Sequence, residues 1–227
     1  MALVAKPGNN NTNRVEQPLL DAGVYPARLV QILDLGLQPQ RAYQGKDKPP
    51  AHEISLTYEL VDAFCVDENG KELEDKPRWI SETLPLYSID QDKAKSTKRY
   101  FALDPKGVDA GDFSLQIGKP INVTLVQNPV GDKVYINVAN IAAMRERDAV
   151  KCPELVNPPK VLDLDNPDME IFGSLPQWLQ DKIKSNLNFK GSKLEAKIGG
   201  KPVEKAPEPV KEEPPEEDAE EKEDAPW

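Results

Sequence analysis

The side chains of this sequence that could do chemistry are aromatic rings and cations, spaced along segments that otherwise resemble strands and loops. Aromatic rings offer flat faces on which bases stack, and lysines and arginines pair with phosphates. Neither contact reads a base sequence, so the combination is typical of proteins that hold single-stranded nucleic acid. The candidate residues for such contacts are Arg41, Tyr43, Lys46, Lys48, Trp79, Lys95, Lys98, Arg99, Lys133 and Tyr135.

Catalytic and metal-binding motifs are missing from the sequence. It holds no G-x-x-x-x-G-K loop, no G-x-S-x-G elbow and no H-E-x-x-H pair. One histidine, His52, leaves no pair for a metal site, and Cys65 and Cys152 fit no metal spacing and are expected as free thiols. The aspartates within 109–112 and 163–168 lack the loop of a calcium site. We therefore expect no enzyme, no cofactor and no metal.

Alternation of apolar and polar residues predicts the strands that position these side chains. The strands are expected at 24–35, 53–62, 78–86, 119–127 and 133–143. Turn residues at 67–70 and 128–132 predict two hairpins. Trp79 and Tyr135 then lie on the sides of their strands that face away from the aliphatic core. An indole in that position either packs beneath a loop or offers its face to a ligand.

A helix is predicted over 88–103, between the third and fourth strands. Ser88 is its expected cap, and its apolar residues fall on one side. The other side carries Lys95, Lys98 and Arg99. Such a cationic side is either an ordinary solvated face or a set of phosphate ligands.

The residues after the fifth strand are expected to extend the domain. Residues 151–167 are predicted to be an extended, proline-spaced connector, followed by a helix over 174–189 with Pro176 in its first turn. Trp178 borders the apolar stripe of this helix and is interpreted as a packing anchor. A homodimer made through the same helix is an open alternative.

The last segment, 201–227, is strongly acidic and rich in proline. Eleven acidic residues stand against four lysines, which gives −7 of the chain's net charge of −10 and leaves the body free to form a basic patch. Low apolar content and like-charge repulsion predict a disordered tail. Its end is either the solvated end of a solubility tail or a hook for a partner. The residues of the expected hook are Glu216, Glu217, Asp218, Glu220, Glu221, Glu223, Asp224, Pro226 and Trp227.

Five strands with one helix between the third and fourth is the element order of an OB-fold barrel. The predicted fold is therefore an all-β core with accessory helices: a five-stranded OB-fold barrel with that helix and a C-terminal helical extension. The expected organisation is a flexible N-terminal arm (1–17), an OB-fold domain (18–148), a connector with a C-terminal helix (149–198) and a disordered acidic tail (199–227).

In this architecture the chain resembles the phage-encoded single-stranded DNA-binding proteins of replication. The likeness rests on a small OB domain, a C-terminal helical extension and an acidic tail, EEDAEEKEDAPW, that ends on an aromatic residue. In that family the tail competes with DNA for the groove and, once displaced, recruits DNA polymerase, primase-helicase or recombination proteins. Pro226-Trp227 stands at the matching place, with Trp where Phe is usual.

The expected function is sequence-independent binding of single-stranded DNA in phage DNA replication and recombination, in the host cytoplasm. No apolar run reaches the length of a membrane span, so no membrane contact is expected. Two alternatives stay open. One is an OB-fold protein–protein adaptor in which Trp79 and Tyr135 merely pack, and the other is an acidic DNA mimic that binds no DNA.

Overall fold

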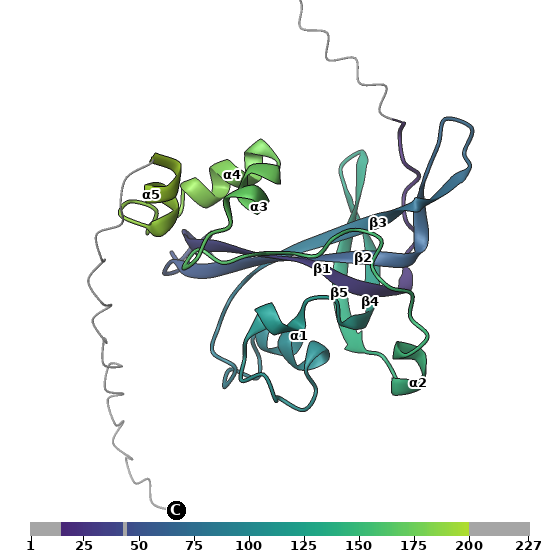
Figure 1. The fold of residues 1–227 in the computed structure, drawn as a ribbon, viewed down its shortest axis with the longest axis horizontal. Helices are drawn as coiled ribbons and strands as arrows, with labels where there is room; N and C mark the ends of the chain where they lie inside the picture. Colours follow the sequence, from purple (N-terminus) through teal and green to yellow (C-terminus); the bar gives the residue numbers. More distant parts are fainter. Residues whose placement is uncertain (1–14, 43–44, 200–227) are drawn as a thin grey trace, which may run out of the picture.

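The core is built from strands, as the alternation predicted, and helices lie around it (Figure 1). The structure is a computed structural model and describes residues 15–42 and 45–199. The strands are β1 (Gly23–Gln38), β2 (Ala51–Val66), β3 (Glu72–Pro85), β4 (Pro120–Val130), β5 (Lys133–Ala143) and β6 (Lys160–Leu162). The helices are α1 (Lys95–Leu103), the 3-10 helix η1 (Phe113–Gln116), α2 (Glu146–Ala149), α3 (Met169–Ser174), α4 (Gln177–Lys184) and α5 (Lys193–Gly199).

The strands form one sheet in the order β3-β2-β1-β4-β5, in which every neighbouring pair is antiparallel. The long strand β1 pairs with β2 along one edge. On its other edge the first half pairs with β4, as at Ala27 and Ile121, and the second half pairs in parallel with β6, as at Ile32 and Val161. Within the described residues no backbone ladder joins β3 to β5. The pairing therefore leaves the sheet open where the predicted OB-fold barrel would close.

All five predicted strands are present, and most are longer than the alternation indicated. In β2 the inward residues Ile54, Leu56, Tyr58 and Leu60 are buried, which confirms the predicted core face. Backbone pairing extends this strand beyond the alternating stretch to Val66. The sixth strand, β6, was not predicted, because three residues are too few to show a period.

Both predicted hairpin turns are confirmed. After β2, the Asp67 carboxylate accepts hydrogen bonds from the backbone N–H groups of Asn69 (2.8 Å) and Lys71 (2.9 Å). Gly70 follows with φ of +77°, a backbone conformation that glycine adopts without a Cβ clash. Between β4 and β5, Gly131 has φ of +59° for the same reason.

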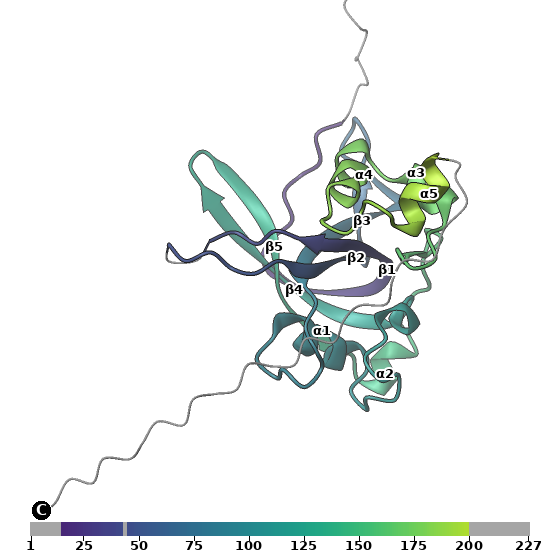
Figure 2. The ribbon, with the colours of Figure 1, turned by 90° about the vertical axis from the view of Figure 1, so that its left-hand side faces the viewer.

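Two apolar clusters lie on opposite sides of the sheet. The larger one is enclosed by β1–β5 and α1 and includes Leu29, Leu56 and Tyr100. The second joins Leu33 and Leu35, on the outer side of β1, to residues of the C-terminal helices. Figure 2 shows α3–α5 on one side of the sheet and α1 and α2 on the other. The C-terminal segment therefore packs against the sheet and shields the outer side of β1.

The helix that was predicted over 88–103 begins only at Lys95. Residues 88–94 form turns instead, in which the carbonyl of Ser88 accepts a hydrogen bond from the hydroxyl of Thr97 (3.2 Å). Ser88 is therefore not the cap, and the residue before the helix, Ala94, makes no side-chain capping bond.

The helix that was predicted over 174–189 is shortened to α4, and Ser174 is the last residue of a separate helix, α3. Proline disfavours the helical conformation in the residue before it, and Leu175 accordingly is extended, with ψ of 150°. α4 then starts after Pro176 and ends at Lys184. The predicted packing role of Trp178 is wrong, because its side chain is 67% exposed. No helix among residues 15–42 and 45–199 is long and apolar enough to cross a membrane.

Candidate nucleic-acid interface

The two faces of β3 carry different chemistry. Alternation along the strand turns Trp79, Ser81 and Thr83 outward and Glu82 and Leu84 inward. The two inward residues are buried, whereas the three outward residues are exposed. The inner face meets α1 and the core, and the outer face is the side that a ligand can reach.

On the inner face, Glu82 is the centre of a polar network. Its carboxylate accepts hydrogen bonds from Nε of Arg99 (2.8 Å), Nζ of Lys95 (2.8 Å) and the hydroxyl of Tyr58 (3.0 Å). Arg99 also donates from Nη1 to the amide oxygen of Asn140 in β5 (3.0 Å). Burial and the neighbouring Glu82 carboxylate hold the pKa of Tyr58 well above its ordinary value. Through Arg99, helix α1 ties β3 to β5, the two ends of the strand order.

This network corrects the prediction that the cations of α1 form an outer, phosphate-binding face. Arg99 is 2% exposed and its guanidinium is engaged with β3 and β5, so its prediction as a DNA ligand is wrong. The side chain of Lys95 is half-exposed, but its ammonium group is paired with Glu82. Of the three predicted cations, Lys98 is exposed and has no ion pair within the described part of the chain.

On the outer face, Trp79 lies away from the aliphatic core, at the position that the alternation predicted. Its indole is 40% exposed, and Nε1 donates to Oε2 of Glu59 (3.0 Å). Glu59 is 1% exposed and also accepts from the backbone N–H of Val156 (2.7 Å) and from Nδ2 of Asn157 (2.6 Å). The polar edge of the indole is therefore satisfied by the protein, and part of the side chain stays exposed.

Residues 152–157 cross the outer face of β1 and β2. Arg28 donates from Nη2 to the carbonyl of Cys152 (2.9 Å) and from Nε to that of Pro153 (2.6 Å). Glu59, which is opposite Arg28 in the β1–β2 register, holds the other end of the segment. These two charged side chains thus fasten the crossing segment over β1 and β2.

A row of polar side chains shows where the covered surface ends. Gln31 of β1, Thr57 of β2 and Ser81 of β3 are neighbours in the strand register. Their side chains are joined by hydrogen bonds, from Gln31 to Thr57 (3.4 Å) and between Thr57 and Ser81 (2.9 Å). Gln31 and Thr57 are buried, whereas Ser81 is exposed. The accessible part of the outer face is therefore β3 itself.

A cleft of about 490 Å³ lies at the end of this exposed strip. It is lined by Gln38, Pro39, Gln40, Arg41, Ala42, Lys48, Glu53, Thr83, Pro85 and Lys182. Because Thr83 and Pro85 belong to the outer side of β3, the cleft continues the surface on which Trp79 stands. We call the surface from Trp79 through Ser81 and Thr83 to this cleft the β3 lane.

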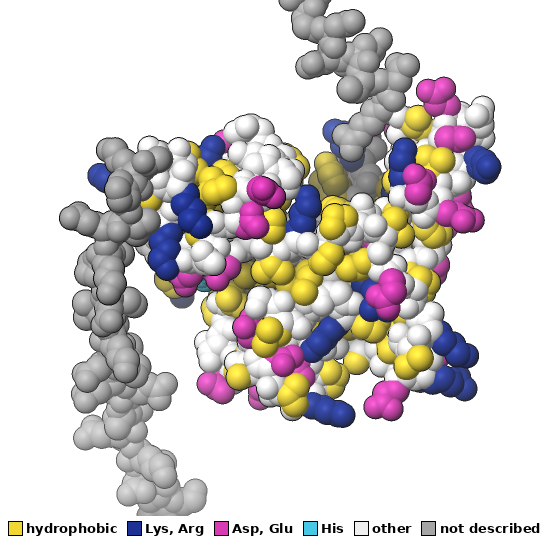
Figure 3. All heavy atoms as spheres, in the orientation of Figure 1, with side chains coloured by type: hydrophobic (Ala, Val, Ile, Leu, Met, Phe, Trp, Pro, Cys, Tyr) yellow, Lys and Arg dark blue, Asp and Glu magenta, His cyan; other side chains and the backbone are white. Residues whose placement is uncertain are grey.

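The cleft carries a positive charge. Its lining includes three cations, Arg41, Lys48 and Lys182, and one carboxylate, Glu53. Nζ of Lys182 pairs with Oε2 of Glu53 at 2.7 Å, and Gln40 donates to the other carboxylate oxygen at 2.9 Å. The structure thus brings together Arg41 and Lys48, two of the predicted phosphate ligands, and adds Lys182. Figure 3 shows further Lys and Arg side chains on the C-terminal helices and hydrophobic side chains between these helices and the rest of the body.

The other predicted ligands lie elsewhere. Lys133 and Tyr135 are on the hairpin of β4 and β5, where the Tyr135 ring is 50% exposed. Lys46 is exposed in the β1–β2 loop. Figure 2 shows this loop and the β4–β5 hairpin projecting to the same side, while Figure 1 shows them apart. Tyr43 and the tail residues 216–227 lie outside the described residues.

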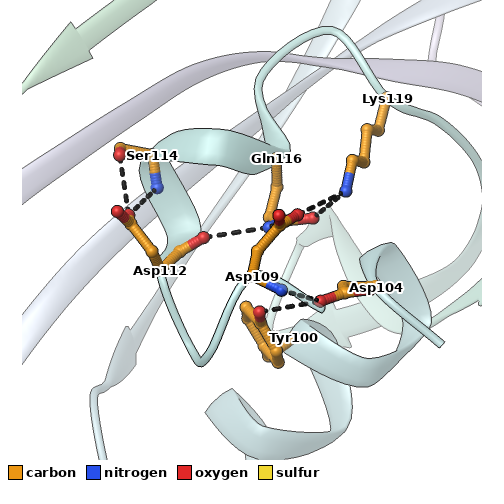
Figure 4. A network of polar contacts seen from close by, with 7 residues as sticks. All are labelled: Tyr100, Asp104, Asp109, Asp112, Ser114, Gln116 and Lys119. Carbon is orange, nitrogen blue, oxygen red and sulfur yellow. Dashed lines mark hydrogen bonds and ion pairs between the residues drawn. The ribbon is translucent and has the colours of Figure 1, made fainter. Parts of the chain in front are cut away.

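The aspartates of the loop after α1 stabilise that loop by accepting hydrogen bonds (Figure 4). Asp109 accepts from Nζ of Lys119 (3.0 Å), a hydrogen bond that holds the pKa of Asp109 below its ordinary value. Asp104 accepts from the backbone N–H of Asp109 (2.9 Å) and from the Tyr100 hydroxyl (2.9 Å), and the first of these lowers the pKa of Asp104. Asp112 caps η1. These carboxylates stabilise turns.

The second group of aspartates has the same structural use. Asp163 accepts from the backbone N–H of Asp165 (2.7 Å), and Asp168 caps α3. Among the described residues no cluster of three or more His, Cys, Asp or Glu side chains is arranged to hold a metal ion. Cys65 and Cys152 are free, as expected from their spacing.

Three residues of the interface were not predicted from the sequence: Arg28, Glu59 and Lys182. Glu59 and Arg28 occupy polar positions in predicted strands, but nothing local indicates that a segment some hundred residues later covers them. Lys182 stands in a predicted helix. It lines the cleft beside β2 and β3, but because it is far from both strands in the sequence, no local pattern indicates this contact.

No protein-family model matches the chain, and no curated protein shows significant similarity to it. Its function is therefore inferred from the interface itself.

Proposed function

We propose that this chain is a sequence-independent single-stranded DNA-binding protein of phage DNA replication and recombination. The observation that carries the proposal is the β3 lane, where an exposed indole and a positively charged cleft share one open strand face. Bases stack on aromatic side chains and phosphates follow cationic grooves, which together bind a single strand without reading its sequence.

The dimensions of the lane suit a short stretch of nucleic acid. Trp79 and Pro85 are six residues apart on β3, which corresponds to about 20 Å at roughly 3.3 Å per residue. In this proposal one base stacks on Trp79 while phosphates lie in the cleft, where the charges of Arg41, Lys48 and Lys182 outweigh that of Glu53. Ser81 and Thr83, between these ends, supply hydroxyl groups that donate to the strand or accept from it.

The proposal includes an OB-type barrel as the scaffold. In OB folds a ligand lies on the face of strands 2 and 3, between the β1–β2 loop and the β4–β5 loop. Here the first of these loops carries Arg41, Lys46 and Lys48, and the second is followed by Lys133 and Tyr135. The helix between β3 and β4, which holds both ends of the sheet through Arg99, stands at the place expected for this fold.

The acidic residues of 201–227 are proposed to compete with DNA for the cationic cleft. Their net charge of −7 imitates a polyanion, so the tail would suppress weak binding and be released when a phosphate chain fills the cleft. Trp227 and the acidic residues from Glu216 onward would then recruit replication proteins such as DNA polymerase or primase-helicase. The proposed place of action is the host cytoplasm.

Titration of the full chain with oligo-dT, followed by fluorescence anisotropy of a labelled oligonucleotide and by tryptophan emission, tests the proposal. We expect binding with quenched emission and an affinity that falls steeply with salt, because counterions are released from the strand. The same affinity for oligo-dT and for mixed-sequence strands is expected. Absence of binding at micromolar oligonucleotide in low salt would contradict the proposal and favour a protein-binding adaptor.

Deletion of residues 204–227 tests the competing tail. We expect the truncated protein to bind oligo-dT more tightly at low salt and to lose recruitment of replication proteins. Trp227→Ala is the matched control, because it keeps the acidic charge and should impair recruitment alone. Weaker DNA binding after truncation would contradict the competition.

A further inference from the structure

Helix α4 presents an exposed indole that neither apolar cluster uses. Trp178 is 67% exposed, whereas Leu179 and Ile183 of the same helix are buried against the outer side of β1. Exposed polar residues, Gln177 and Asp181, stand beside it on the helix and are hydrogen-bonded to each other (2.7 Å). The ring is therefore a single aromatic surface in polar surroundings rather than part of a broad apolar patch.

The contacts at the two ends of α4 define its course along the sheet. Ser174, just before the helix, accepts a hydrogen bond from Nζ of Lys160 (2.9 Å), and Lys160 is paired with Gln31 of β1. Beyond the other end, the backbone N–H of Leu187 donates to the carbonyl of Leu37 (2.9 Å). The helix thus lies over β1 with its N-terminal end at the level of Gln31 and its C-terminal end at the level of Leu37.

The strand register shows which residues of the β3 lane lie at the same levels as the two ends of α4. Gln31 is aligned through Thr57 with Ser81. At the other end, Glu53 is paired with Pro85, and Lys182 reaches Glu53 (2.7 Å). The N-terminal end of α4 is therefore at the level of the middle of the lane, near β6 and β1, and its C-terminal part reaches the cleft through Lys182.

Helix periodicity gives the side of α4 on which the indole stands. Residues four apart share a side, so Trp178 is one turn before Lys182 and projects from the same side. Lys182 points toward β2 and β3, because its ammonium group meets Glu53 and lines the cleft together with Thr83. Trp178 consequently stands on the side of α4 that faces β2 and β3, at a level between Ser81 and the cleft.

We propose that Trp178 is a second base-stacking platform and that single-stranded DNA runs between the outer face of β3 and α4. This inference rests on the proposed function and extends its site to the C-terminal helices. The charges favour this occupant: Arg41, Lys48 and Lys182 exceed the single carboxylate, Glu53, on the adjoining cleft. With Trp79, the chain then offers two rings on one lane, one from the sheet and one from the helix.

Removal of the ring gives the first test. Trp178→Ala is expected to weaken oligo-dT binding by about 5- to 150-fold, the loss that corresponds to roughly 1 to 3 kcal/mol per stacked base. Trp178→Phe keeps a stacking face and should recover most of the affinity. Ile198→Ala removes an exposed apolar side chain from α5 and is the matched control, with unchanged affinity. Equal urea midpoints of all variants would show that folding is unaffected.

Fluorescence emission of Trp178 distinguishes stacking from a purely structural role, because DNA should quench the emission only if a base lies on the ring. In the double variant Trp79→Phe, Trp227→Phe it is the remaining tryptophan, and saturating oligo-dT is expected to quench it. Normal affinity of Trp178→Ala, or unchanged Trp178 emission while anisotropy reports binding, would overturn this inference and leave the proposed function intact. Absence of binding by the unmutated chain would overturn both.

Discussion

The inner and outer faces of β3 use the same kinds of side chain for opposite purposes. On the inner face, cations from α1 converge on the buried carboxylate of Glu82 and hold β3 and β5 together. On the outer face, cations from the β1–β2 loop and α4 surround a cleft that adjoins an exposed strip with Trp79. A lysine or arginine close to an aromatic residue in the sequence thus does not indicate a binding site until it is known whether a carboxylate of the fold pairs with that cation.

The difference follows from desolvation. A buried charge is stable only when it is paired and hydrogen-bonded, so Arg99 and Glu82 depend on each other. An exposed cation keeps its water and is available to exchange it for a phosphate. Substitutions on the inner face should therefore change stability, and those on the outer face should change binding.

The largest effect is expected from Arg99→Met. Loss of the guanidinium leaves Glu82 buried with fewer partners and unties β5, which should lower the free energy of unfolding by about 3 kcal/mol or more. Urea denaturation measures this loss. Lys98→Met, on the same helix and exposed, should change stability by less than about 0.5 kcal/mol. A stable Arg99→Met protein with weakened DNA binding would reverse the roles of the two faces.

Trp79→Ala is expected to act on binding. Loss of one stacked base should weaken oligo-dT binding by roughly 1 to 3 kcal/mol. Trp79→Phe separates the ring from its polar edge, because it abolishes the hydrogen bond to Glu59 but keeps a stacking face. Anisotropy titrations of both variants decide between these roles. If Phe and Ala were equally harmful, the indole N–H rather than the ring would matter.

A smaller effect is expected from Arg41→Ala. Loss of one phosphate contact should reduce the slope of log affinity against log salt by about 0.7 for a single strand. Titrations between low and moderate salt measure the slope. Arg147→Ala in α2, a highly exposed arginine that does not line the cleft, should leave the slope unchanged. Equal slopes for Arg41→Ala and the unmutated chain would remove Arg41 from the β3 lane.

Acid should lower the free energy of unfolding by protonating the aspartates that stabilise the loop after α1. Asp104 and Asp109 have a lower pKa in the folded protein than the ordinary value of a free aspartate, so the unfolded chain takes up protons first. Their contribution is complete above pH 4 or so and is lost as the pH falls through their folded pKa values. Urea midpoints at pH 6 and pH 3 measure this, and Asp109→Asn should show a smaller acid loss. An unchanged acid loss in that variant would contradict the role of Asp109.

The smallest effect is expected from His52, with the opposite sign. Its hydrogen bond to Asp34 (3.0 Å) raises the pKa of the imidazole, so the pair stabilises the fold below about pH 6.5 and loses this contribution as the pH rises through the folded pKa. Because the imidazole is half-exposed, we expect a change of only tenths of a kcal/mol. Unfolding at pH 5.5 and pH 8 should differ less in His52→Gln than in the unmutated chain.

Sequence reasoning predicted what depends on neighbours in the chain. The alternation around Leu56 gave the core face of β2, and Asn69-Gly70 gave the hairpin, because period and turn chemistry are local. The same reasoning placed Trp79 on the outer side of its strand. It was wrong about Arg99 and Trp178, since helical periodicity gives a side of a helix but not the element that this side meets.

The sequence by itself determined the strands β1–β5, the hairpin turns, the outward direction of Trp79 and the acidity of the last segment. Only the tertiary structure decided which charged groups are buried and paired within the fold and which stay exposed at its surface. Glu82 accepts a hydrogen bond from Arg99, which is 17 residues away in the sequence, and Glu59 accepts one from Val156, which is 97 residues away. The physical reason is that burial and pairing depend on contacts between distant segments, and these contacts exist only once the chain is folded.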